Sequence, residues 1–147
     1  MTVDEPKLLA WGEQLGRRLK GGECIELVGD VGAGKTTFTK ALAKGIGIDE
    51  DVQSPTFTLS RVYETDKLSL HHYDFYRLND AGVMAYELAE SVADPRAVVV
   101  VEWADTVADV LPEDRLIISL QHTPEGDSRR ISINSNPGYK YLYDFMS

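Results

Sequence analysis

The 147-residue sequence predicts a single α/β domain, residues 1–147, with three layers and a mixed, largely parallel sheet. Three observations support this fold class. A glycine-rich turn joins an apolar strand to a helix near residue 30, strands and helices then alternate along the chain, and a short polar loop joins the last two strands as a hairpin. Hydrophobic residues make up 43% of the chain, which is enough for one core at this length.

The turn has the sequence GDVGAGKTT at residues 29–37, which matches the phosphate-binding pattern G-x-x-x-x-G-K-[ST]. Residues 24–28 before it are typical of a buried strand, and residues 36–44 after it have the apolar spacing of a helix. In this context the backbone N–H groups and the positive end of the helix dipole face an anion. The sequence therefore predicts a nucleotide-binding domain of the P-loop NTPase type.

Each residue of the motif has an expected task. Lys35 reaches the β and γ phosphates, the Thr36 hydroxyl ligates a magnesium ion, and Thr37 touches the α phosphate. The turn that curls around the phosphates is formed by Gly32, Ala33 and Gly34.

The other elements are predicted from periodicity and from turn residues. Apolar residues recur at helical spacing in the first segment, with Asp4 as a possible cap and Gly21-Gly22 as the end. The expected order is a helix over 6–20, a polar loop over 49–53 that leads through 54–59 into a strand, a strand over 67–75, a helix over 80–91, a strand over 97–101, a short helix over 105–111, strands over 115–122 and 130–134 with a hairpin loop at 124–127, and a terminal helix from residue 137.

The charge and composition limit the classes of partner and location. A net charge of −9 and a pI near 4.7 argue against an extended nucleic-acid surface, so any nucleic acid is expected to be held by a partner. The amino terminus lacks the features of a signal peptide, and the longest aliphatic run, residues 97–101, is too short to cross a bilayer. We therefore expect a cytoplasmic protein without a membrane partner, in which the single cysteine, Cys24, is a buried apolar residue.

The end of the aliphatic run is expected to supply the acid that holds the metal. A continuous Val run is typical of a strand that is buried on both faces, and it delivers Glu102 to the edge where P-loop proteins carry such an acid. The acid is usually Asp, so the longer Glu102 requires a slightly more distant strand end. The alternative is a surface carboxylate after a core strand. Trp103 is expected to lie near the nucleotide, near a partner or in the core.

Asp74 lies at the end of the strand over 67–75, and ligands of open α/β sheets bind at the carboxyl ends of strands. Its possible roles are to position the attacking water or to contact magnesium through water. The alternative is a cap for the turn over 75–79. The segment 54–56 offers the hydroxyl of Thr56, which could reach the metal or the γ phosphate as nucleotide-sensing loops do.

The three histidines are not expected to form a metal site. His71 and His72 are adjacent on a strand and so face opposite ways, and His122 is isolated.

Four motifs together resemble the bacterial TsaE (YjeE) ATPases. They are GDxGAGKTTF at 29–38, SPTF at 54–57, HxDxYR at 72–77 and EW at 102–103, in this order. The resemblance extends in length and helix placement along almost the whole chain. It implies a small ATPase that is needed to make threonylcarbamoyladenosine in tRNA, working with the TsaD and TsaB proteins and meeting tRNA only through them.

The resemblance also implies ATP and Mg²⁺ as cofactors and a switch-like loop over 54–58. The family contacts the adenine end with its first helix, where Leu8 stands in place of a common threonine, and with a late arginine, which Arg129 or Arg130 matches. The implied site residues are Lys35, Asp74 and Glu102 for catalysis, Thr36 and Glu102 for magnesium, and Thr56 and Trp103 beside the nucleotide.

Two other functions compete with an ATPase that cycles a protein assembly between states. A small-molecule kinase usually clamps donor and acceptor with several arginines on a mobile lid, whereas the interval 80–112 contains only Arg96. A GTP-binding switch is disfavoured because the chain contains no Asn-Lys-x-Asp sequence. The sequence therefore favours the ATPase, with slow hydrolysis by the isolated chain.

Overall fold

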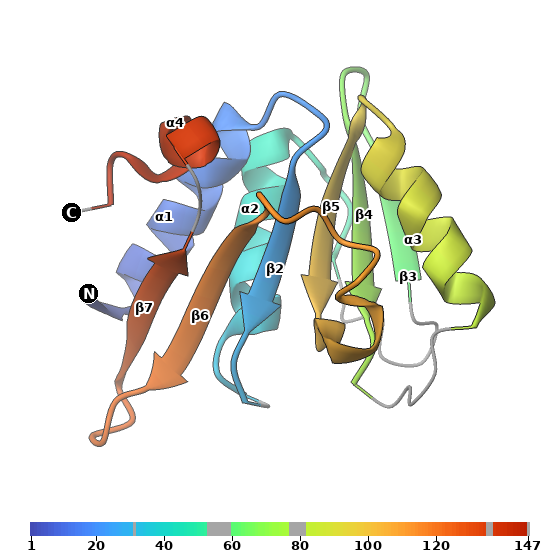
Figure 1. Cartoon of the computed structure of the whole chain (residues 1–147). Helices are drawn as coiled ribbons and strands as arrows, with labels where there is room; N and C mark the ends of the chain where they lie inside the picture. Colours follow the sequence, from blue (N-terminus) through green and yellow to red (C-terminus); the bar gives the residue numbers. More distant parts are fainter. Residues whose placement is uncertain (31, 53–59, 77–81, 135–136, 147) are drawn as a thin grey trace.

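The computed structural model describes residues 1–30, 32–52, 60–76, 82–134 and 137–146. Its strands form one seven-stranded sheet in the order β1-β7-β6-β2-β5-β4-β3 (Figure 1). The four central strands, β6, β2, β5 and β4, are mutually parallel, and the strands at both edges pair antiparallel. This mixed sheet confirms the predicted fold class. The strands are β1 Thr2–Asp4, β2 Cys24–Val28, β3 Ser60–Glu64, β4 Ser69–Asp74, β5 Ala97–Glu102, β6 Leu116–His122 and β7 Ser128–Asn134.

Helices cover both faces of the sheet and complete three layers (Figure 1). On one face α1 (Glu5–Arg18) packs along α2 (Lys35–Ile46), and α4 (Lys140–Tyr143) packs against α1. On the other face α3 (Val83–Ala93) packs on β5. Two short 3₁₀ helices, η1 (Ala104–Val107) and η2 (Pro137–Tyr139), lie in the connections.

The sheet separates two apolar clusters. Val98 and Val100 of β5 face the layer of α1 and α2, whereas Val99 and Val101 face α3 and its Leu88. All six residues of β5 are buried. The Val run is therefore a strand that is buried on both faces, as its composition predicted.

Glycines bring α1 and α2 into close contact. A side chain added at Gly16 would lie 2.1 Å from the carbonyl oxygen of Leu42, and one added at Gly45 would lie 2.0 Å from the carbonyl oxygen of Glu13. Only a residue without a Cβ fits at either position. This contact holds α2, and with it the phosphate-binding turn, against the rest of its layer.

The structure differs from the sequence-based expectations in two places. The amino terminus forms the short edge strand β1, which pairs with β7, where no strand was predicted. The segment predicted as a helix over 105–111 contains instead the 3₁₀ helix η1. The predicted loop over 54–59 lies outside the described residues. No described helix combines the length and the apolar character that a membrane span requires.

Candidate functional site

The candidate site lies where β2 ends and α2 begins. Gly34 caps α2 with a left-handed backbone (φ 104°), and its carbonyl oxygen accepts the first helical hydrogen bond from the Phe38 N–H at 2.8 Å. Gly29 is the residue after β2, and it packs closely against β6. A Cβ added to Gly29 would lie 2.5 Å from the carbonyl oxygen of Leu120. Glycine is thus required at both ends of this turn, where the motif predicted a backbone that curls around phosphates.

A cavity of about 160 Å³ opens at this turn. Whole-ligand pockets usually measure about 300–1,000 Å³, so this volume suits phosphate groups rather than a complete nucleotide. Arg129 of β7 is fixed at its rim, where the Nε atom donates to the carbonyl oxygen of Ala33 at 3.1 Å. The cavity is lined by Gly32, Gly34, Lys35, Thr36, Thr37 and Arg129.

The two candidate arginines have different positions. Arg129 lines the cavity, whereas Arg130 is exposed on β7 and pairs opposite Thr2 of β1. Successive residues of a strand face opposite ways, so only one of the two can face the turn. Arg129 is therefore the one of these two arginines that faces the turn.

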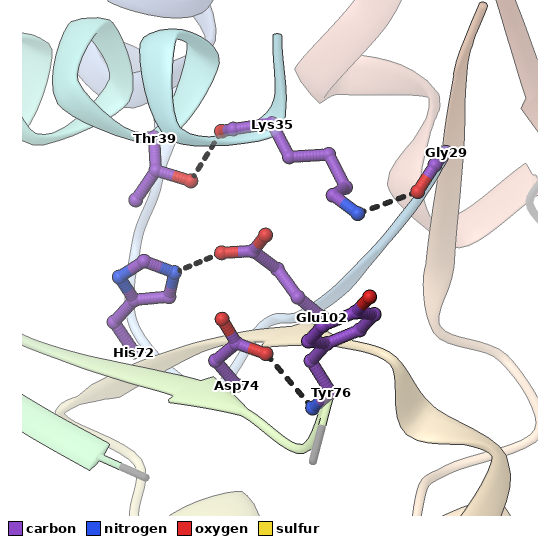
Figure 2. A network of polar contacts seen from close by, with 7 residues as sticks. All are labelled: Gly29, Lys35, Thr39, His72, Asp74, Tyr76 and Glu102. Carbon is purple, nitrogen blue, oxygen red and sulfur yellow. Dashed lines mark hydrogen bonds and ion pairs between the residues drawn. The ribbon is translucent and has the colours of Figure 1, made fainter. Parts of the chain in front are cut away.

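Lys35 connects the turn to the strand ends. Its Nζ donates to the carbonyl oxygen of Gly29 at 2.5 Å (Figure 2). The same atom lies 3.9 Å from the centre of the Trp103 ring. Burial lowers the pKa of Lys35, while the negative charges of Glu102, Asp74 and Asp30 oppose that shift. The ammonium group is therefore held among carboxylates, at the place where the motif requires a positive charge.

Asp74 and Glu102 lie opposite each other because β4 and β5 are paired in parallel with these two residues in register. Both are nearly inaccessible, at 5% and 2% exposure. Asp74 Oδ1 accepts a hydrogen bond from the Tyr76 N–H at 3.0 Å (Figure 2), which is the turn-capping contact considered as the alternative role. Both acids thus stand at the carboxyl ends of neighbouring parallel strands, where α/β proteins bind ligands.

His72 is a site residue that the sequence reasoning missed. Its Nε2 lies 2.6 Å from Glu102 Oε2, and its side chain is fully buried (Figure 2). The available signal was the alternation of side chains along a strand, which puts His72 on the same face as Asp74 two residues later. The neighbouring His71 faces the opposite side of the sheet from His72, as expected, and hydrogen-bonds Ser91 of α3 at 2.8 Å.

Trp103 has an unusual backbone. Its φ of 57° and ψ of 54° make it the one residue other than glycine with positive φ in the described parts of the chain. Such strain in a bulky residue costs about 1–3 kcal/mol and is concentrated at functional sites. The ring of Trp103 contacts both Lys35 and Tyr76, and the centres of the Trp103 and Tyr76 rings are 4.7 Å apart. It also lines a cavity of about 260 Å³ beside Asp30 and Asp105.

The oxygen donors at the site fit magnesium better than a metal held by protein alone. Across the described ranges, no three or more His, Cys, Asp or Glu side chains are grouped to hold a metal. Magnesium keeps several waters and is usually bound through one or two protein oxygens together with substrate phosphates. The hydroxyl of Thr36 and the carboxylate of Glu102 are donors of this kind.

The remaining predicted residues have simple positions. Thr56 lies outside the described residues. Leu8 of α1 is buried and its Cδ2 would lie 3.4 Å from a Cβ at Gly34, so the first helix does approach the turn.

Cys24 is buried, and burial raises its pKa to about 12, as befits an unreactive core thiol. Arg96 donates to the carbonyl oxygens of Thr65, Asp66 and Lys67, at the end of the sheet remote from the turn.

Comparison with known proteins agrees with the four motifs. Residues 2–131 match the family described as "Threonylcarbamoyl adenosine biosynthesis protein TsaE". A tRNA threonylcarbamoyladenosine biosynthesis protein TsaE from Treponema pallidum is 42% identical over 84% of this chain and 90% of its own, and one from Bacillus subtilis is 39% identical over 91% and 83%.

A solved structure is similar over nearly the whole fold. The structure described as "Crystal structure of Bacillus subtilus YdiB" has a TM-score of 0.77 and 32% identity, covering 99% of this chain and 92% of its own. The motifs, the strand order and these similarities lead to one conclusion: the chain belongs to the TsaE family.

Proposed function

We propose that this chain is a P-loop ATPase that binds ATP with Mg²⁺ and works in the cytoplasm with the TsaD and TsaB proteins to form threonylcarbamoyladenosine in tRNA. Its membership of the TsaE family supports a role in this biosynthesis. Hydrolysis, the two partners and the contact with tRNA through them are parts of the proposal.

One observation carries the proposed activity. The structure has a phosphate-sized cavity at the start of α2, and Lys35, which lines it, is held near two buried carboxylates at adjacent strand ends. In P-loop ATPases most of the catalysis is electrostatic. It comes from positively charged groups that contact the phosphates and from an acid at a strand end that holds the metal ion.

The roles follow from these positions. Lys35 leaves the Gly29 carbonyl to pair with the β and γ phosphates, because a phosphate is a stronger acceptor than a neutral carbonyl. Arg129 adds a second positive charge at the rim of the cavity. When bound, Mg²⁺ would neutralise charge that develops on the phosphates, and Thr36 and Glu102 would hold it.

Asp74 is the candidate for orienting the attacking water. It pairs with Glu102 at the carboxyl ends of β4 and β5, and its Oδ1 accepts a hydrogen bond from the Tyr76 N–H, which holds the carboxylate at that end of the sheet. Thr56 is proposed to sense the γ phosphate from its loop.

Among the described residues, two cationic side chains line the cavity, Lys35 and Arg129. Arg96 is tied to backbone carbonyls far from the cavity, so it is not a lid arginine. A site with so little positive charge is expected to be slow until a partner completes it. By linkage, if the partners prefer the ATP-bound chain, ATP strengthens their assembly by the same factor, typically about 1–3 kcal/mol.

The test measures ATP hydrolysis by the wild-type chain with and without TsaB and TsaD, and the affinity of the assembly with an ATP analogue, with ADP and without nucleotide. We expect slow hydrolysis that the partners change, and an assembly that depends on nucleotide. Thr56→Ala is expected to weaken that dependence, and Lys35→Ala serves as the control without nucleotide binding.

Equal assembly in all nucleotide states, with hydrolysis indifferent to the partners, would contradict the proposal. A screen of small-molecule phosphoryl acceptors would then test the kinase alternative.

A further inference from the structure

The contact between His72 and Glu102 joins two strands inside the core of the site. Both side chains are buried, and the 2.6 Å separation of Nε2 and Oε2 is that of a strong hydrogen bond. A carboxylate oxygen can only accept, so Nε2 of His72 is the donor. The bond therefore fixes one oxygen of Glu102. Figure 2 shows the other oxygen pointing away from the His72 ring.

The opposite side of the imidazole ring is unusual. Nδ1 of His72 is buried and has no hydrogen-bond partner among the residues that the structure describes. A buried polar atom without a partner costs about 1–3 kcal/mol, so a position that served packing alone would favour an apolar residue. Leu70, two residues earlier on the same face of β4, is such a residue. The imidazole is therefore explained by its bond to Glu102.

Glu102 needs such a bond more than an aspartate would. A glutamate has one more rotatable bond than the usual aspartate at this position, and holding it in one orientation costs more conformational entropy. Within the described ranges, His72 is the one residue that hydrogen-bonds this carboxylate. Ligating carboxylates are themselves commonly held by hydrogen bonds, whose loss weakens metal binding.

We propose that His72 is a positioning residue that holds one oxygen of Glu102 so that the other is presented to the magnesium–nucleotide complex. This inference rests on the proposed function, because it assigns a task to a residue that does not itself touch metal or phosphate. His72 thus lets a glutamate serve at a strand end where a shorter aspartate is usual.

The experiment compares His72→Phe, which keeps a planar ring without a donor, with His72→Gln, whose amide N–H can replace the Nε2 donor. Mn²⁺ is the probe, titrated into protein loaded with a non-hydrolysable ATP analogue and followed by electron paramagnetic resonance. We expect His72→Phe to weaken Mn²⁺ about 10–100-fold, His72→Gln to regain most of that loss, and analogue affinity in EDTA to stay unchanged. His71→Phe is the matched control, because His71 faces α3 and bonds Ser69 and Ser91.

The outcomes separate the two proposals. If wild type binds Mn²⁺ with the analogue and a folded His72→Phe binds it equally well, the positioning role is wrong and the proposed function stands. If wild type binds no Mn²⁺ at all, the proposed function fails and this role fails with it.

A measurement on wild type covers the case in which His72→Phe does not fold. Nitrogen NMR of the intact protein is expected to show His72 protonated at Nε2, with a proton that exchanges slowly and shifts in Glu102→Gln. A ring protonated only at Nδ1 would overturn the proposal.

Discussion

Two buried glutamates stand at opposite ends of the central strands, each with 2% exposure. Glu23 precedes β2, and its oxygens accept hydrogen bonds from the N–H groups of Lys20 and Gly21 and from the Tyr141 hydroxyl, at 2.6–2.8 Å. Glu102 ends β5, and in the described parts of the chain its carboxylate has one hydrogen-bond partner, His72.

The difference teaches how to recognise a functional carboxylate. A buried carboxylate costs free energy unless its lone pairs are satisfied. Glu23 meets this requirement with groups of its own chain and so stabilises the fold. Glu102 meets this requirement only in part, because His72 bonds one of its two oxygens. The other oxygen is available for a ligand, and the charge of Lys35 acts on the same carboxylate.

Lys35→Ala is expected to have the largest effect, because it removes the positive charge beside Glu102. Losing two charge-assisted bonds to phosphates, each worth about 1.5–3 kcal/mol, is expected to weaken ATP binding roughly 10²–10⁴-fold. Calorimetric titration measures the affinity, and circular dichroism checks the fold. The variant also loses contacts with Gly29 and Trp103, so a small loss of stability accompanies the effect. Near-normal affinity in a folded variant would remove the phosphate-loop assignment.

Glu102→Gln keeps an oxygen that accepts from His72 but removes the negative charge. Hydrolysis that depends on Mg²⁺ is expected to fall by about 100-fold or more, since metal-borne charge stabilisation is worth several kcal/mol. Affinity for ATP in EDTA is expected to change little, and so is the melting temperature. Unchanged hydrolysis would move the metal site, with Asp74 as the next candidate.

Glu23→Gln is the same substitution at the opposite end of the central strands, where the carboxylate stabilises the fold. The NH₂ group of the new amide would face one of the donors that now bond to the carboxylate. That donor would lose its acceptor, and the expected cost is about 2 kcal/mol of unfolding free energy. Urea denaturation measures that loss. ATP affinity should equal that of wild type, and a loss of ATP binding without a loss of stability would erase the contrast between the two glutamates.

The pH dependence of stability tests the structural role of Glu23 through its partner Tyr141. Burial and the hydrogen bond to Glu23 raise the pKa of Tyr141 above its usual value of 10.0. The folded state therefore keeps a proton that the unfolded state releases, so this stabilisation is complete below pH 10 and falls as the pH rises above it. Tyr141→Phe is expected to lose about 1.5 kcal/mol at neutral pH and to show a shallower loss of stability in alkaline denaturation curves. An unchanged slope would show that the pair does not govern this pH range.

Local patterns predicted the parts of the site that neighbouring residues determine. The glycine motif located the turn and Lys35, and the Val run identified the strand that ends in Glu102. Period two placed Asp74 at a strand end and separated His71 from His72. These features need only a few consecutive residues, because each depends on backbone conformation or on alternation along one strand.

Features that depend on register between distant strands were not predictable in this way. The bond between His72 and Glu102 spans 30 residues and requires β4 beside β5 with Asp74 opposite Glu102. The strand β1 has three residues and forms because β7 pairs with it, so no pattern of its own marks it. The choice of Arg129 over Arg130 likewise needed the face of β7.

Titration of ATP into the wild-type chain with Mg²⁺, followed by calorimetry with GTP as competitor, tests the central claim that this turn is an ATP site. We expect one ATP bound per chain and poor displacement by GTP. Absence of saturable ATP binding, or equal affinity for the two nucleotides, would contradict it.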